Sequence, residues 1–295
     1  MEAYFMGIDT GTQGVRIGIS DTRGKLIFEK EQKWETEFPK VGWAEQNPLN
    51  WWKAVNGIFE QIAHTLDSEI RQNIRACCVC ATSTTAIPVD QEGRPLMNAM
   101  MWMDARSRKE MQEINDTGHP VLDYCGKETS FEWMIPKALW IKRHRKDIYD
   151  VCYRIVDQLD WMNYQLCGEW SSSICNTTCK WNYVSSMGGY QRDFFEQIGF
   201  EDYEEKLTMR VDKIGDPVGT IRPELSEKYG FSREMQIVQG GIDAHMAMFG
   251  LDVLKPGKLG VIMGTSFVHL CLSDEKPDMK GIWGPYDGAV LDNMW

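Results

Sequence analysis

The sequence has 295 residues, with 43 acidic side chains against 32 lysines and arginines and a net charge of −11. An acidic surface repels the phosphate backbone of DNA or RNA, which argues against a general nucleic-acid binder. Hydrophobic residues make up 43% of the chain and charged residues 25%, which is typical of a globular and not of a disordered protein. The length is sufficient for about two domains of ordinary size.

The cysteines and the N-terminus bear on the compartment. Nine cysteines is an odd number, and a chain this long needs no disulfide scaffold. The first residues lack a basic region followed by an apolar stretch, and no apolar run reaches the ~20 residues of a membrane helix. We therefore expect a cytoplasmic protein in a reducing compartment, without a membrane partner.

In chain order, the first expected elements are three strands. Residues 4–9 are apolar and end on an acid, and residues 15–20 alternate between apolar and polar with period two. Between them, residues 10–14 contain two glycines and predict a tight turn, and residues 25–34 predict a third strand. The glycine-rich turn therefore lies inside a β-hairpin, not between a strand and a helix.

The rest of the chain predicts a mixture of helices and short strands. Asn47 is a favoured cap and Pro48 suits a first helical turn, so a helix is expected over 48–66. Further helices are expected over 105–115, 133–144, 159–166 and 244–251, and strands over 74–80, 86–89, 236–239, 260–263 and 267–272.

The hairpin turn is the first candidate for chemistry. Asp9, at a strand end, offers a carboxylate to Mg²⁺, and the following turn offers backbone N–H groups and the hydroxyl of Thr12 to phosphate oxygens. Taken alone, such a turn is also compatible with a plain hairpin.

Two later turns have a similar character. Gly240 and Gly241 precede Asp243 at an expected strand-to-helix junction, where glycines allow close approach of a substrate and the carboxylate can accept a hydroxyl proton. The alternative is that Asp243 only caps the following helix. Residues 264–266, Gly-Thr-Ser, form another small polar turn between expected strands.

In this order, these segments resemble the FGGY family of carbohydrate kinases, and the resemblance covers nearly the whole chain. Residues 9–16 look like the first phosphate loop of that family, 240–243 like its catalytic-base loop and 264–266 like the entry to its second lobe. Three further segments are similar to family motifs: GWAEQNP at 42–48 to GWxEQxP, MWMDAR at 101–106 to LWxDxR, and DWMNYQLCGE at 160–169 to DYLNYxLTGE.

The resemblance implies an α/β protein with the actin-like ATPase (ribonuclease H-like) fold, a mixed sheet flanked by helices. Residues 1–253 would form the N-terminal lobe, which binds sugar and phosphate, and residues 254–295 the beginning of an incomplete nucleotide-binding lobe. The motif that holds adenine is absent from the sequence. We therefore expect an N-terminal fragment or an incomplete gene product that, alone, has no measurable kinase activity.

The implied chemistry is transfer of the γ-phosphoryl group of ATP to a terminal hydroxyl of a small sugar. Asp243 would accept the proton of that hydroxyl, and Asp9 would position Mg²⁺ directly or through water. The expected residues of the phosphate and magnesium site are Asp9, Thr10, Gly11, Thr12, Gln13, Arg16, Gly264 and Thr265.

The expected sugar contacts are Ser83, Thr84, Trp102, Asp104, Lys180 and Asp243. Residues 80–85 lack the Arg-Glu pair of glycerol kinases and the Met-His pair of xylulokinases, whereas 178–181 resemble a lysine-bearing segment of ribulokinase-like members. A ketopentose such as ribulose or xylulose is thus the preferred substrate, and a polyol stays open. Lys180 is equally compatible with a solvated lysine, and Trp43, Trp102 and Trp181 with positions in the core.

Other interpretations stay open. Actin-like folds also occur in non-catalytic nucleotide-binding proteins, although these have no use for the segments 43–48 and 102–106. An inactive, truncated pseudo-kinase is a further alternative. Residues 77–80 contain a C-x-x-C pattern without a neighbouring histidine, which favours a buried strand over a metal or redox site. The oligomeric state is open, a homodimer included.

Overall fold

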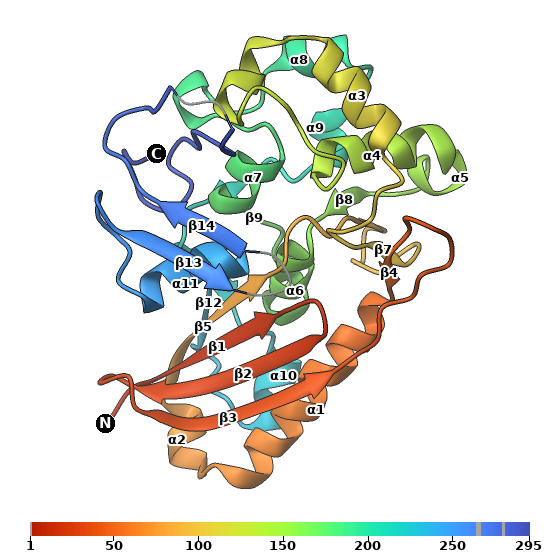
Figure 1. Cartoon of the computed structure of the whole chain (residues 1–295). Coiled ribbons are helices and arrows are strands. Elements are labelled where there is room, and N and C mark those ends of the chain that lie inside the picture. The colour runs from red at the N-terminus through yellow and green to blue at the C-terminus, as the bar shows by residue number, and fades with distance from the viewer. Residues whose placement is uncertain (1, 264–266, 279–280) are drawn as a thin grey trace.

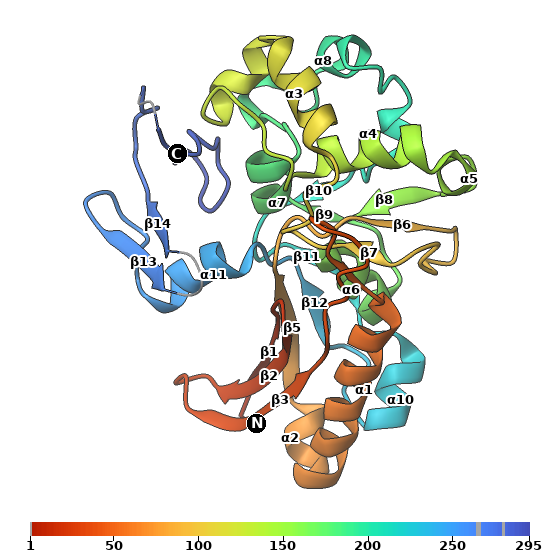
Figure 2. The ribbon, with the colours of Figure 1, turned by 45° about the vertical axis from the view of Figure 1, so that its right-hand side comes forward.

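The computed structural model describes residues 2–263, 267–278 and 281–295, which are arranged in two main parts (Figure 1). The lower part in that view is built on a six-stranded sheet, and the upper part is mostly helical. A hairpin near the C-terminal end projects from the side of the molecule, as Figure 2 shows. Residues 264–266, which include the predicted phosphate contacts Gly264 and Thr265, lie outside the described residues.

The large sheet is mixed and has the strand order β11-β12-β5-β1-β2-β3. The central strand β1 pairs antiparallel with β2 and parallel with β5, and β5 pairs parallel with β12. The bounds of its strands are β1 (Tyr4–Thr10), β2 (Gly14–Asp21), β3 (Leu26–Lys33), β5 (Ile74–Ala81), β11 (Pro217–Thr220) and β12 (Gln236–Val238). The carboxyl ends of β1, β5 and β12 consequently lie at the same edge of the sheet.

The two faces of this sheet differ in burial. Met6, Ile8 and Thr10 of β1 are buried, whereas the alternate residues Gly7 and Asp9 are not. Side chains of the buried face pack against three helices in one hydrophobic cluster, and Figure 2 shows these helices on one side of the sheet. The helices are α1 (Pro48–Thr65), α6 (Gln158–Cys167) and α10 (Pro223–Tyr229). The period of two along each strand thus decides which side chains face the helices.

Local sequence determines where α1 begins and where α6 begins and ends. α1 begins as expected, with Pro48 in its first turn and the Asn47 side chain accepting a hydrogen bond from the Leu49 N–H. α6 begins with a capping box between Asp157 and Asp160 and ends at Gly168, whose φ is +85°.

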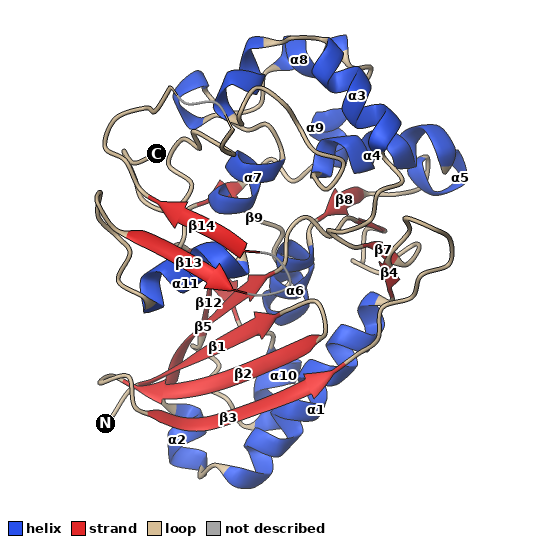
Figure 3. Cartoon of the chain, in the orientation of Figure 1, coloured by secondary structure: helices blue, strands red, loops and turns tan. Residues whose placement is uncertain are grey.

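The upper part has its own hydrophobic cluster, formed by helices and small two-stranded sheets (Figure 3). Its helices are α3 (Arg108–Asp116), α4 (Met134–His144), α5 (Lys146–Tyr149), α7 (Ile174–Lys180), α8 (Arg192–Gln197) and α9 (Tyr203–Lys206), with 3₁₀ turns at Pro120–Tyr124 and Ser185–Met187. Its strand pairs are β4 (Glu45–Gln46) with β7 (Ala99–Met100), β6 (Ile87–Val89) with β8 (Arg154–Val156), and β9 (Ser172–Ser173) with β10 (Val211–Asp212). α2 (Ser68–Gln72) lies at the opposite end of the molecule.

The last elements are α11 (Asp243–Gly250) and the antiparallel hairpin of β13 (Leu259–Met263) and β14 (Phe267–Cys271). The expected elements agree with the structure to within a few residues. The largest shift is at the start of α3, because the Ala105 and Arg106 N–H groups donate to the Gly42 carbonyl and the Asp104 carboxylate. Among the described residues, no helix combines the length and apolar character needed to cross a membrane.

Candidate active site

Three parallel strands deliver polar side chains to one edge of the large sheet. Asp9 of β1 is the register partner of Cys80 in β5. Just after β12, Ile242 forms a parallel bridge with Ala81, and Asp243 follows as the first residue of α11. Because the strands run in the same direction, their carboxyl ends bring Asp9 and Asp243 into the same region, where ligands commonly bind in α/β proteins.

The charge of Asp9 acts on the carboxylate of Asp243. Burial is the main cause that raises the pKa of Asp243 to about 6, and the negative charge of Asp9 acts in the same direction. The Ala244 N–H, which donates to Asp243 Oδ1 at 2.7 Å, and the positive charge of Lys180 oppose this rise. At pH 7 most molecules therefore carry an ionised Asp243 that is more basic than an ordinary carboxylate. Although Asp243 begins a helix, Ile242 occupies the cap position.

Cys80, which the sequence pattern assigned to a buried strand, is a neighbour of both acids. Its Sγ donates to Asp9 Oδ1 at 3.5 Å. Burial, followed by the charges of Asp9 and Asp243, raises the pKa of this thiol well above its usual range, so it stays protonated at neutral pH. The expectation of a largely buried strand over 77–80 agrees with the structure, in which Cys77 is fully buried.

Asp9 has the surroundings of a site that binds Mg²⁺ together with phosphate. Mg²⁺ commonly uses one or two carboxylates, substrate phosphates and water instead of a cage of protein ligands. No cluster of three or more His, Cys, Asp or Glu side chains that could hold a metal occurs in the described ranges. A single half-buried carboxylate beside a glycine-rich turn fits the ion in that mode.

The turn between β1 and β2 borders a cavity of about 160 Å³. Asp9, Gly11, Gln13 and Arg16 line it, so the structure brings together four of the predicted phosphate-site residues. The Gly11 N–H is already used, because it donates to the Gly14 carbonyl at 2.9 Å. The backbone donors left for phosphate oxygens in this turn are therefore those of the two residues at its tip.

One predicted phosphate contact needs correction. The side chain of Thr10 is fully buried, and its hydroxyl donates to the Cys80 carbonyl at 2.9 Å, so it does not reach a nucleotide. Strand alternation is the reason, since Asp9 on the open face forces Thr10 onto the helix-covered face. Arg16 is on the open face but lies 3.5 Å from Glu29 and 3.8 Å from Glu31, which offset part of its charge.

The glycines of the two loops serve backbone packing. A Cβ atom at Gly240 would lie 1.8 Å from the Val79 carbonyl oxygen, and one at Gly14 would lie 2.5 Å from the Gln32 carbonyl oxygen. Contacts this short are impossible, so only glycine fits. Gly240 is therefore explained by the close approach of β12 to β5, and not by close approach of a substrate as the sequence suggested.

A buried polar cluster surrounds the predicted sugar contacts Ser83 and Thr84. Ser83 Oγ donates to Asp157 Oδ2 at 2.8 Å, and Asn176 Nδ2 donates to the same oxygen at 3.0 Å. The Thr85 N–H donates to the other oxygen of Asp157. Ser83 is partly exposed, whereas Thr84 has no exposed surface, so of these two only Ser83 is accessible. Asp157 and Asn176 position Ser83, and the sequence patterns missed both.

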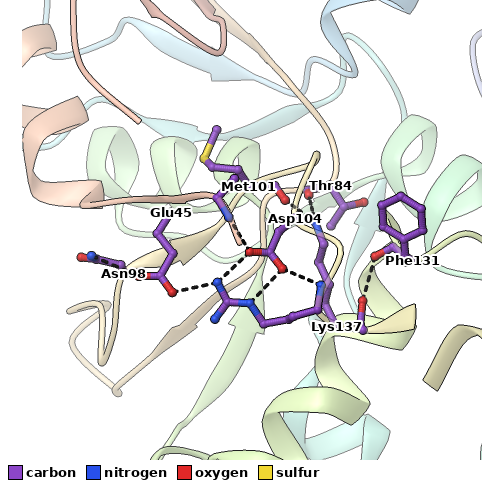
Figure 4. A network of polar contacts seen from close by, with 10 residues as sticks. Glu45, Thr84, Asn98, Met101, Asp104, Phe131 and Lys137 are labelled. Atoms are coloured by element: carbon purple, nitrogen blue, oxygen red, sulfur yellow. Dashed lines mark hydrogen bonds and ion pairs between the residues drawn. The ribbon is translucent and has the colours of Figure 1, made fainter. Parts of the chain in front are cut away.

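Asp104 has a different role from the predicted sugar contact. It is fully buried, and its two carboxylate oxygens accept hydrogen bonds from the Ala44 N–H at 2.7 Å and from Arg106, whose Nη2 lies 2.6 Å away (Figure 4). Arg106 also pairs with Glu45 at 2.7 Å and lies 3.6 Å from the ring centre of Trp43. Asp104 is thus occupied by protein donors and holds the loop that carries Trp102.

Lys137 connects the two segments that carry Ser83 and Trp102. Its side chain is fully buried in α4, and its Nζ donates to the Thr84 carbonyl at 2.7 Å and to the Met101 carbonyl at 2.6 Å (Figure 4). Burial lowers the pKa of Lys137 to about 7. The sequence patterns did not indicate this contact, because a lysine within an apolar helix usually extends its ammonium group to solvent.

The remaining predicted residues differ in how accessible they are. Lys180 is partly exposed at the end of α7, its Nζ is 5.6 Å from the ring centre of Trp133, and its charge acts on Asp243. Trp181 is fully buried and belongs to the core of the upper part. Trp102 is half-buried, and its indole N–H donates to Thr12 Oγ1 at 3.0 Å. Of the three tryptophans considered, only Trp102 contacts the phosphate turn directly.

Comparison with known proteins agrees with this geometry. A family model described as the N-terminal domain of the FGGY family of carbohydrate kinases matches residues 4–250. An FGGY carbohydrate kinase domain-containing protein of Homo sapiens is 29% identical over 100% of this chain and 58% of its own length. A ribulokinase of Bacillus licheniformis is 26% identical over 84% of this chain and 48% of its own length.

Among solved structures, a xylulose kinase from Rhodospirillum rubrum superposes with a TM-score of 0.88 at 16% identity, over 99% of this chain and 59% of that protein. This likeness confirms the predicted actin-like fold of sugar kinases, with a mixed sheet and flanking helices. The chain spans little more than half the length of the relatives that it matches.

Proposed function

Because the chain belongs to the FGGY family of carbohydrate kinases, we propose that the full-length protein transfers the γ-phosphoryl group of ATP to a terminal hydroxyl of a small sugar. The observation that carries this proposal is Asp243, a partly buried carboxylate with a pKa of about 6 that lies close enough to Asp9 for the Asp9 charge to raise this pKa. A carboxylate of that basicity suits a general base at neutral pH.

In the proposed reaction, Asp243 accepts the proton of the sugar hydroxyl. The hydroxyl oxygen forms a bond to the γ-phosphorus while the bond between that phosphorus and the β–γ bridging oxygen breaks, which releases ADP. The N–H groups at the tip of the turn, the Thr12 hydroxyl and Arg16 stabilise the phosphate charge. Mg²⁺, when bound at Asp9, supplies further charge neutralisation on the phosphates.

For the sugar, we propose a ketopentose such as ribulose or xylulose. The relatives include proteins named ribulokinase, one of which is 26% identical to this chain, and one named xylulose kinase at 22% identity. The partly exposed hydroxyl of Ser83 and the ammonium group of Lys180 are suitable for hydrogen bonds to sugar oxygens. Trp102 offers an apolar ring face for the sugar carbons.

The test is ADP release by the product of the complete reading frame, measured with a panel of ketopentoses, aldopentoses, hexoses and polyols. We expect one ketopentose to give the highest kcat/KM, with ADP and sugar phosphate formed in equal amounts. Nucleotide binding without sugar-dependent ADP release would instead favour a non-catalytic nucleotide-binding protein. Activity on a polyol alone would contradict the proposed substrate class.

The same assay on residues 1–295 tests which lobe supplies which substrate contacts. We propose that these residues contain the sugar and phosphate contacts, and that turnover needs a second lobe which holds adenine and excludes water. Robust sugar-dependent turnover by residues 1–295 alone would contradict this two-lobed site.

A further inference from the structure

Three side chains from separate segments hold Thr12, at the tip of the phosphate turn. The Thr12 carbonyl accepts hydrogen bonds from Gln46 Nε2 at 2.8 Å and from Trp34 Nε1 at 3.1 Å. The Thr12 hydroxyl oxygen accepts a third bond, from Trp102 Nε1 at 3.0 Å. A carbonyl oxygen has two lone pairs, so both acceptor positions of the Thr12 backbone are filled.

The bond to Trp102 restricts the direction of the Thr12 hydroxyl hydrogen. An indole N–H can only donate, so Thr12 Oγ1 must be the acceptor, and its own hydrogen must point away from the indole. Among the described residues, no protein acceptor receives that hydrogen. The hydroxyl is therefore left as an oriented donor beside Gly11 and Gln13, which line the cavity next to Asp9.

The backbone next to Trp102 is held by hydrogen bonds of Met101. The Met101 N–H donates to the Ala44 carbonyl at 2.9 Å, and the Met101 carbonyl accepts from the buried Lys137 Nζ at 2.6 Å. Lys137 also holds the carbonyl of Thr84, next to Ser83. A continuous series of hydrogen bonds and covalent links thus runs from Thr84, next to Ser83, to the phosphate turn. Figure 4 shows the part of it from Thr84 through Lys137 to Met101.

We propose that Trp102 is a positioning residue that couples the two substrates: its indole N–H orients the Thr12 hydroxyl as a donor to a phosphate oxygen of the nucleotide. The inference rests on the proposed function, in which the sugar packs against the Trp102 ring. A sugar that restricts the ring also fixes the indole N–H, and so strengthens nucleotide binding without touching the nucleotide.

The test is a double-mutant cycle in the full-length protein with Trp102→Phe and Thr12→Val. Phenylalanine keeps a ring for the sugar and removes the N–H, and valine keeps the shape of threonine and removes the hydroxyl. We expect Trp102→Phe to lower kcat/KM for MgATP about tenfold, as for loss of an oriented hydrogen bond to a charged group, and to change the sugar KM less than threefold. Because both changes act through one hydroxyl, the double variant should be no worse than Thr12→Val alone.

Trp34→Phe is the matched control, since it removes an indole N–H from the Thr12 carbonyl and leaves the hydroxyl untouched. The fold-changes that Trp34→Phe and Thr12→Val each cause in kcat/KM for MgATP should multiply in the double variant. Independent, multiplicative effects of Trp102→Phe and Thr12→Val would overturn the inference, as would a rise in the sugar KM alone. Thermal unfolding of each variant shows whether the fold is retained.

Nucleotide affinity separates failure of the inference from failure of the proposed function. If no sugar supports turnover, the proposed function is wrong, and the same cycle is then measured on the dissociation constant of MgADP by titration calorimetry. Non-additive effects there would still support the role of Trp102 toward Thr12, and additive effects would contradict it. Absence of nucleotide binding in the unmodified protein would contradict both proposals.

Discussion

The substitution Asp243→Asn is the most direct test of the site, because it keeps the local structure and removes the proposed base. The Ala244 N–H donates to Asp243 Oδ1 at 2.7 Å, and an asparagine Oδ1 can accept the same bond. The start of α11 should therefore be unchanged. An amide cannot accept the hydroxyl proton, so the expected loss of kcat is the usual contribution of a general base, about 10²–10⁴-fold.

The same variant should be more stable than the unmodified protein at neutral pH. The pKa of Asp243 is raised from 3.8 to about 6 in the folded protein, so the unfolded chain ionises at lower pH. Folding stability contributed by this group is present below pH 4 and is lost as the pH rises to about 6. That difference in pKa corresponds to a loss of at most about 3 kcal/mol of unfolding free energy at pH 7, which the Asn variant avoids. Urea unfolding of both proteins at pH 7.5 and pH 4 measures it, and the gain should be present only at pH 7.5.

The assay is steady-state ADP release with the preferred sugar, together with the pH dependence of kcat/KM. For the unmodified enzyme we expect activity to fall below about pH 6 as Asp243 becomes protonated. Loss of kcat smaller than about tenfold in Asp243→Asn, or an unchanged acidic limb in its pH profile, would refute the assignment of this residue as the base.

Three further predictions concern the surroundings of the site. Asp9→Ala should weaken use of Mg-nucleotide more than sugar binding, because it removes the carboxylate beside the phosphate turn; an unchanged magnesium dependence of kcat in the full-length protein would contradict this. Gly240→Ala should cost at least about 3 kcal/mol of folding stability or prevent folding, because its Cβ would lie 1.8 Å from the Val79 carbonyl oxygen. Gly7→Ala is the matched control, since a Cβ at Gly7 would have nothing within 4 Å, and it should unfold at nearly the same urea concentration as the unmodified protein. Lys137→Met should be destabilising by about 2–4 kcal/mol, since two buried carbonyls lose their donor. Because the pKa of Lys137 is lowered to about 7 in the folded protein, the unfolded chain binds more protons than the folded chain between pH 7 and pH 10. The difference in unfolding free energy between the unmodified protein and the variant should therefore grow over that range.

The sequence alone predicted the longest helices and strands and the positions of the two acids, but not the shorter elements β11 and α10 of the lower part. The cap at Asn47 with Pro48 predicted the start of α1, and the period of two in residues 15–20 predicted a strand with one buried face. Asp9 and Asp243 were singled out because each follows a strand and borders glycines. These features depend on neighbours in the sequence, so they can be inferred from short segments and, through the resemblance, extended to a family.

Only the tertiary structure decided which of the candidate side chains reach the site. Asp104 and Lys137 are fully buried and hydrogen-bonded to protein groups. The Ala44 N–H lies 60 residues from Asp104 in the sequence, and the Thr84 carbonyl lies 53 residues from Lys137. Such pairings arise when separate segments pack, and burial then raises or lowers a pKa that composition cannot predict. The link from Trp102 to Thr12, which spans 90 residues, has the same origin: a hydrogen bond is specified by the positions of two atoms, and those positions exist only in the folded chain.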